Sequence, residues 1–253
     1  MKFVRFFKNA EIAYGAVSGD DVYGVAGDVF SRYAVGDAHV PLSDITVLAP
    51  CVPSKIVAIG LNYRSHAQEL DMQLPDEPMV FMKPSTTVIG HNDNICYPSM
   101  SQRLDYEAEL GVVIGKRCSH VSVDEAPQFI LGYTCFNDVT ARDLQQKDGQ
   151  FTRSKGFDTF APMGPCIETE LDPENVGIEC FLNGKKRQSG STRDLIFSVY
   201  SLVSFLSRIM TLLPGDVIAT GTPSGIGPMQ VGDVVEVKID GIGTLRNSVA
   251  AGK

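Results

Sequence analysis

The sequence lacks the patterns that mark several large classes of protein. Its six cysteines are scattered, with no C-x-x-C pair and no zinc-like spacing, so we predict reduced, mostly buried thiols. No apolar run approaches the roughly 18 residues of a membrane-spanning helix. Charged residues interrupt the opening segment MKFVRFFKNAEIAYG, which argues against a secretory signal peptide. Together these features predict a cytoplasmic protein.

An excess of positive charge is also lacking. The formal net charge is −8 and the pI is about 5.0, which argues against a nucleic acid or an anionic membrane as the partner. A small anionic substrate is compatible with this charge, because a bound metal ion can reverse the sign of the field inside a pocket. With 43% hydrophobic and 21% charged residues, the 253-residue chain can bury a sizeable core.

The strand pattern divides the chain near residue 50. The segments FVRFF, IAYGAV and DVYGVAG predict a small antiparallel β domain over residues 1–50. After the linker APCVPSK, strand and turn patterns continue and predict a catalytic domain over residues 51–253. Helical patterns are limited to NYRSHAQEL, VDEAPQFI, TARDLQQKD and SVYSLVSFLSRIM. Because strands and helices do not alternate, a doubly wound parallel sheet is disfavoured, and we predict a β-rich α+β fold.

Three acidic residues alternate along one predicted strand, in the segment LDYEAELGVVIGK. Residues two apart in a strand share a face, so Asp105, Glu107 and Glu109 would repel one another unless a cation neutralises them. Oxygen ligands without a nearby His or Cys favour Mg²⁺ or Mn²⁺ over Zn²⁺. Asp138 ends another apolar strand, GYTCFND, and is a candidate third ligand. The alternative is a solvent-exposed acidic strand face.

Basic residues and a glycine-rich segment supply candidate contacts for an anion. Lys83, Arg142 and Lys155 lie in apolar or turn-rich surroundings and together suit a substrate carboxylate, which Arg142 can bind through two N–H groups. Each of them alone would be a surface charge. The glycines of GTPSGIG (221–227) let backbone N–H groups approach an oxyanion. This segment lacks the G-K-[ST] ending of a P-loop, so nucleotide binding is not indicated.

A histidine and a glutamate form a candidate proton-transfer pair. His66 and Glu69 lie three apart in NYRSHAQEL, so on a helix the carboxylate can orient the imidazole and raise its basicity. The alternative is an ordinary pair on a surface helix. The proline-bounded segment DMQLPDEP that follows is typical of a mobile lid.

Six motifs in order resemble those of the fumarylacetoacetate hydrolase family: GLNYRSHAQE, FMKPST, LDYEAELGVVIGK, FNDVTARDLQ, SKGFDTFAPMGP and LLPGDVIATGTPSGIG. The resemblance covers about residues 51 to 250 and implies a mixed β-roll core that forms a homodimer. It implies Mg²⁺ or Mn²⁺ on Glu107, Glu109 and Asp138. Catalytic residues implied in the same way are His66, Glu69 and Lys155. The implied substrate contacts are Asn62, Tyr63, Lys83, Arg142, Gln145 and Thr222.

The resemblance leaves the reaction open. It implies a small 2-oxo acid handled through a metal-stabilised enolate. Isomerisation or tautomerisation, as in 2-hydroxyhepta-2,4-diene-1,7-dioate isomerase, and decarboxylation rank above hydrolysis of an acylpyruvate. A non-catalytic metal-binding protein would not need His66, Glu69, Arg142 and Lys155. A zinc hydrolase is disfavoured because neither His nor Cys accompanies the carboxylates.

Overall fold

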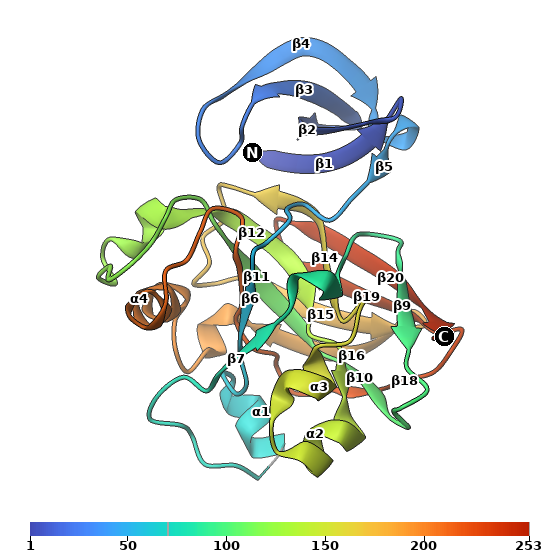
Figure 1. Cartoon of the computed structure of the whole chain (residues 1–253), viewed down its shortest axis with the longest axis vertical. Coiled ribbons are helices and arrows are strands. Elements are labelled where there is room, and N and C mark those ends of the chain that lie inside the picture. Colours follow the sequence, from blue (N-terminus) through green and yellow to red (C-terminus); the bar gives the residue numbers. More distant parts are fainter. Residues whose placement is uncertain (70, 253) are drawn as a thin grey trace.

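The computed structural model describes residues 1–69 and 71–252, in which strands predominate over helices (Figure 1). The strands of these residues form three sheets, and most neighbouring strands run antiparallel. The predicted β-rich α+β class is therefore confirmed.

The largest sheet joins the first strands of the chain to those of the core. Over the described residues its main path runs through β4 (Tyr33–Pro41), β3 (Asp21–Gly27), β2 (Glu11–Ser18), β1 (Lys2–Lys8), β14 (Ala161–Glu168), β12 (Ile130–Asn137), β11 (Ala108–Ile114), β17 (Val217–Ala219), β6 (Ile56–Ile59) and β7 (Val80–Lys83). Two short strands add to it, β5 (Thr46–Val47) beside β1 and β8 (Val88–Ile89) beside β14.

The N-terminal strands reach the rest of this sheet through β1. Strand β1 pairs antiparallel with β14, which sets Phe3 opposite Ile167, and both side chains are fully buried. The blue strands at the top of Figure 1 thus extend a sheet that begins in the core. Alternation within a segment cannot reveal such a partner, because it reports only which face of a strand is buried.

Two smaller sheets complete the described fold, and the five-stranded one packs against β11, β12 and β14 of the large sheet. The first has the order β13 (Thr140–Ala141), β10 (Leu104–Tyr106) and β18 (Gly227–Met229). The second has the order β16 (Lys185–Ser191), β15 (Gly177–Leu182), β19 (Val234–Ile239), β20 (Gly243–Ala251) and β9 (Asn94–Tyr97). The chain leaves β10 and enters β11 of the large sheet with Glu107 alone between them, and this transition positions the site.

Three of the four predicted helical patterns form α-helices: α1 (Arg64–Glu69), α2 (Arg142–Asp148) and α4 (Val199–Ile209). The prediction for VDEAPQFI was too long. That segment forms only a 3₁₀ turn, η3 (Ala126–Phe129), because Pro127 lacks an N–H and Ile130 is already extended at the start of β12. A short helix without apolar periodicity, α3 (Phe151–Lys155), was not predicted. Helices α1, α2 and α3 gather at the lower end of Figure 1. The remaining 3₁₀ turns are η1 (Leu42–Asp44), η2 (Ser85–Thr87) and η4 (Thr192–Asp194).

The centre of the large sheet is covered on both faces. Every residue of β6, β11 and β17 is buried, and apart from Glu109 of β11 none of them has a polar side chain. Five of the six cysteines are buried and all are free thiols, as predicted. Within the described residues, no helix combines the length and apolarity needed to cross a bilayer.

Candidate active site

Three buried carboxylates meet where β10 passes into β11. Glu107 lies between the two strands, Glu109 lies in β11, and Asp138 directly follows β12. One carboxylate oxygen from each lies within 4.8 Å of the other two, and none of the three residues is more than 5% exposed. The backbone holds them together, because the Asp138 N–H donates to the Glu107 carbonyl at 2.9 Å. The Glu107 N–H donates to the side-chain oxygen of Asn137 at 3.0 Å.

Asp105 does not join this cluster. Its carboxylate accepts from Nε of Arg103 and from Nε of Arg142, each at 2.9 Å. Asp105 belongs to β10, which pairs with β13 and β18, whereas Glu109 belongs to β11 of the large sheet. This corrects the expectation that all three acids of the segment crowd together, because the chain changes sheets between them.

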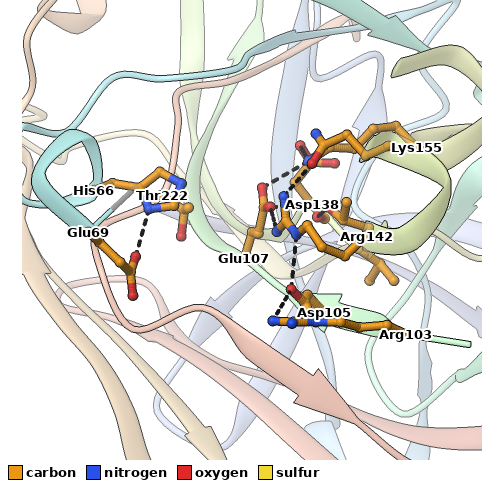
Figure 2. Close-up of polar contacts among 12 residues, drawn as sticks. His66, Glu69, Arg103, Asp105, Glu107, Asp138, Arg142, Lys155 and Thr222 are labelled. Atoms are coloured by element: carbon orange, nitrogen blue, oxygen red, sulfur yellow. Dashed lines mark hydrogen bonds and ion pairs between the residues drawn. The ribbon is translucent and has the colours of Figure 1, made fainter. Parts of the chain in front are cut away.

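Three cations neutralise part of the cluster (Figure 2). Lys155 donates to Oε2 of Glu107 at 2.8 Å and to Oδ2 of Asp138 at 2.6 Å. Lys83 donates to the other Asp138 oxygen and to the Val139 carbonyl, the latter at 3.2 Å. Arg142 donates to Glu107 and, at 2.6 Å, to the side-chain oxygen of Gln145. Predicted catalytic and substrate-binding residues from β7, α2 and α3 therefore meet at the carboxylates.

Ionisation within the cluster follows these contacts. Burial alone would raise the pKa of Glu107, but Lys155 and Arg142 hold that pKa well below its usual range. Burial lowers the pKa of Lys83 to about 8, against the opposing field of Asp138. For Lys155, burial would lower the pKa, but Asp138 and Glu107 raise it above the ordinary value. Glu107 is thus a carboxylate at neutral pH.

Glu109 is the carboxylate of the cluster whose negative charge a bound metal ion would neutralise. Among the described residues it forms no ion pair, and its one hydrogen bond is accepted from the Gly221 N–H at 2.8 Å. Burial, followed by the charges of Asp138 and Glu107, raises its pKa well above the ordinary value of 4.5. A cation would remove that penalty. The donor set, which consists of carboxylate oxygens alone, fits a hard divalent ion such as Mg²⁺ or Mn²⁺.

The predicted His66–Glu69 pair is formed, and the histidine side chain is buried. Nδ1 of His66 lies 2.8 Å from Oε2 of Glu69 in α1, at the left of Figure 2. The other Glu69 oxygen accepts a hydrogen bond from the Gly225 N–H at 2.9 Å, so the 221–227 loop helps to hold the Glu69 carboxylate in place. His66 is 3% exposed, which argues against an ordinary surface pair.

One cavity of about 190 Å³ connects this pair to the carboxylate cluster. His66 lines it together with Glu107, Arg142, Gln145 and Lys155. Its apolar lining includes Leu61, Met72, Met79 and Phe151. Met72 lies in the predicted lid, residues 71–78, and Met79 directly follows it; the lid is exposed for most of its length. Groups for proton transfer and for charge stabilisation thus face the same small space.

The remaining predicted contacts are buried outside this lining. Asn62 is fully buried, and its amide bonds the backbone of Phe197 and Thr220 at 2.7–3.0 Å. The Thr222 hydroxyl donates to the Ala108 carbonyl at 2.8 Å and accepts from Gln188 at 2.7 Å. Tyr63 is fully buried, and its hydroxyl has no hydrogen-bond partner within the described residues. Contact of these three with substrate stays a prediction.

A family model described as fumarylacetoacetate (FAA) hydrolase, C-terminal, matches residues 55–250. The chain belongs to this family. A second model, described as Rv2993c-like, N-terminal, matches residues 1–50. The resemblance stated from the six motifs is confirmed.

Similar proteins carry several activities within the family. The oxaloacetate tautomerase YisK of Bacillus subtilis is 44% identical over 230 residues, which cover 85% of this chain and 76% of the relative. The crystal structure of 2-hydroxyhepta-2,4-diene-1,7-dioate isomerase from Mycobacterium marinum is 39% identical, with a TM-score of 0.93 and coverage of 99% and 98%. Maleylpyruvate hydrolase from Sphingobium, solved with manganese(II) and pyruvate, is 28% identical, with a TM-score of 0.85 and full coverage of both chains.

Sequence patterns missed several side chains at the site. Met72, Met79 and Phe151 line the cavity; Met72 lies in the predicted lid and Met79 directly follows it, whereas nothing in the sequence indicated Phe151. Gln188 is buried behind the carboxylates in the polar strand KKRQSGS, where no local pattern indicates a role.

Proposed function

We propose that this chain is a Mg²⁺- or Mn²⁺-dependent enzyme that relocates a proton on a short 2-oxo dicarboxylic acid, as in the keto–enol tautomerisation of oxaloacetate. The observation that carries the proposal is the shared cavity of about 190 Å³, which is lined by His66 and by the charged groups Glu107, Arg142 and Lys155. The tautomerase and isomerase activities of similar proteins support the same reaction class.

His66 is the proposed base. A hydrogen on Nδ1 satisfies Glu69 at 2.8 Å, which leaves Nε2 free to accept a proton from the substrate carbon. The Gly225 N–H holds Glu69 and thereby the ring orientation. When bound by Glu107, Glu109 and Asp138, the divalent ion supplies Lewis-acid stabilisation of the 2-oxo carboxylate.

Lys155 is the proposed proton donor to the substrate oxygen. Its ammonium carries three N–H groups, and the carboxylates of Glu107 and Asp138 use two of them. The third can donate to an oxygen in the cavity that Lys155 lines. His66 lines the same cavity, so in the keto-to-enol direction it takes a proton from carbon while Lys155 gives one to oxygen. Exchange with solvent restores both groups, and the enol-to-keto direction uses the same transfers in reverse.

The cavity size favours a short substrate. A volume of about 190 Å³ lies below the roughly 300–1,000 Å³ of pockets for drug-sized ligands. Met72, Met79 and Phe151 add apolar surface to its lining. We therefore rank a short acid such as oxaloacetate above a longer dienedioate.

Three other reactions suit residues of the same site. Isomerisation of a longer 2-hydroxydienedioate is supported by the Mycobacterium marinum structure and by the flexible thioether side chains of Met72 and Met79. Hydrolysis of an acylpyruvate is supported by the Sphingobium structure with manganese and pyruvate. Decarboxylation would use the carboxylate cluster without needing His66.

A tautomerase assay with metal control tests the proposal. Conversion of enol-oxaloacetate to the keto form is followed by ultraviolet absorbance in Mn²⁺ or in EDTA, with pyruvate formation measured in parallel. His66→Ala should slow the conversion by roughly 10²–10⁴-fold, the usual contribution of general acid–base catalysis. The matched control His39→Ala removes an exposed histidine of β4 and should match the wild type. Full activity of His66→Ala, or equal rates in EDTA and Mn²⁺, would refute the proposal.

We further propose a cytoplasmic homodimer whose first 50 residues form a domain of their own. Support comes from the family resemblance, the scattered free thiols and the separate family model over residues 1–50. Light scattering after size-exclusion chromatography measures the dimer, and a monomeric mass would contradict it.

A further inference from the structure

Gln188 is a buried amide outside the cavity lining. It lies in β16, is 1% exposed, and faces Cys180 of β15. The register skips from Gln188 to Lys186 across this strand pair, so Arg187 is the extra residue of a β-bulge. Bulges re-aim neighbouring side chains.

The Gln188 amide completes a closed ring of hydrogen bonds around Ala108, the residue between Glu107 and Glu109. Its Oε1 accepts the Ala108 N–H at 3.0 Å, and its Nε2 donates to the Thr222 hydroxyl at 2.7 Å. The Thr222 hydroxyl in turn donates to the Ala108 carbonyl at 2.8 Å. Both polar groups of the residue between two candidate metal ligands are thus held by side chains.

The same amide anchors the loop that supports the proton-transfer pair. Nε2 of Gln188 also donates to the Pro223 carbonyl at 2.8 Å. On one side of that proline, the Gly221 N–H donates to Glu109 at 2.8 Å. On the other side, the Gly225 N–H donates to Glu69 at 2.9 Å. One short loop therefore contacts both functional groups of the site.

The 221–225 loop packs closely against β16. A Cβ on Gly190 would lie 2.7 Å from Cβ of Pro223, and a Cβ on Gly225 would lie 2.2 Å from the Arg187 carbonyl oxygen. Such separations leave no space for a side chain at either glycine. The position of the loop therefore depends on the position of β16.

We propose that Gln188 is a positioning residue, which holds the 221–225 loop as a common support for the Glu107–Glu109 carboxylates and for the His66–Glu69 pair. Partners that orient metal ligands typically contribute 10–100-fold to metal affinity or activity. The alternative is a buried amide that only satisfies its own hydrogen bonds. The activity part of the proposal rests on the proposed reaction and the metal-affinity part on the proposed metal site, whereas the amide-exchange part rests on neither.

Gln188→Leu separates these possibilities. It leaves the Ala108 N–H and the Pro223 carbonyl without the amide, so Mn²⁺ affinity measured by calorimetry should fall 10–100-fold. Hydrogen exchange of the metal-free protein should quicken in peptides that cover 107–110 and 221–226. In the tautomerase assay kcat should fall more than KM changes. The control Gln128→Leu, at an exposed glutamine of η3, should leave all three readouts unchanged.

One further variant keeps the proposal testable if the leucine variant does not fold, and a double variant tests the hydrogen-bond ring if it does. Gln188→Glu keeps the shape and the acceptor for Ala108 but loses both donors when ionised, so it should also lose Mn²⁺ affinity. The double variant Gln188→Leu/Thr222→Val should lose no more affinity than the larger single loss, since both residues belong to one ring. Wild-type Mn²⁺ affinity and amide exchange in folded Gln188→Glu would overturn the proposal, and so would strictly additive losses in the double variant. Lost metal affinity without any tautomerase activity in the wild type would support Gln188 and refute the proposed function.

Discussion

Replacement of Lys155 by methionine should make the stability of this protein depend on a divalent metal. The ammonium of Lys155 bridges Glu107 at 2.8 Å and Asp138 at 2.6 Å, and the residue is 2% exposed. Methionine fills a similar volume without charge. The two carboxylates would then face each other and Glu109 with less compensation.

The expected size of the effect follows from the burial of the pair. Removal of one partner from a buried ion pair costs about 3–5 kcal/mol. Lys83 still contacts Asp138 and Arg142 still contacts Glu107, so we expect the lower end of that range. In a chain of this size each 1 kcal/mol shifts the melting temperature by about 2–4 °C, which predicts a loss of about 6–12 °C in EDTA.

Thermal unfolding in EDTA and in saturating Mn²⁺ measures this effect. A metal ion at about 1,000 times its Kd stabilises the folded state by about 4 kcal/mol, and it also supplies the positive charge that Lys155→Met lacks. The gap between the variant and the wild type should therefore be smaller in Mn²⁺ than in EDTA. The control Lys186→Met removes a half-exposed surface pair with Glu179 and should change stability by at most about 1 kcal/mol. Equal melting temperatures of Lys155→Met and wild type in EDTA would refute the reasoning.

Three further outcomes are expected. Glu109→Gln should abolish Mn²⁺ binding in calorimetry yet raise the melting temperature in EDTA at neutral pH. Burial and like charges raise the pKa of Glu109, so its ionisation destabilises the fold only at pH values above the unfolded pKa near 4.5. The gain in melting temperature should therefore shrink as the pH falls toward 4.5. A gain that does not depend on pH would contradict this account. Arg142→Lys should weaken Mn²⁺ binding about tenfold, because an ammonium cannot reach Asp105, Glu107 and Gln145 together, and unchanged affinity would argue against this role. Oxalate, which resembles the chelating end of a pyruvate enolate, should bind only with metal present, and equal affinity in EDTA would exclude chelation.

The segment that contains Asp105, Glu107 and Glu109 shows what a local sequence pattern can predict and where it fails. The alternation of Asp105, Glu107 and Glu109 correctly marked a strand with unusual acidic content, and the last two do lie together with Asp138. It failed for Asp105 because alternation assumes one continuous strand in one sheet. Here the chain exchanges partners at Glu107, and Asp105 turns to Arg103 and Arg142 instead.

Long-range pairing accounts for most of what the sequence could not reveal. Strand β14 pairs with β1, and the bulge at Arg187 aims Gln188 at Ala108, a residue from a different sheet. Neither β14 nor β16 has a strong apolar alternation of its own. Helix α3 is too short to show a helical period, although it carries Lys155. By contrast, α4 has enough turns for its apolar stripe to be recognised directly, and its Leu202 and Leu206 are fully buried.

The paired lysines at the carboxylates have a consequence for the order of assembly. Many small metal sites leave the chain unfolded until the ion arrives. In this chain, Lys83 and Lys155 already supply counter-charge to Asp138 and Glu107, so the native fold can form first and the ion can enter afterwards. Folded protein is then no guarantee of loaded protein. Under the proposed metal dependence, a preparation can give a single sharp melting transition and still contain molecules without metal, and its specific activity will then reflect metal content as well as purity.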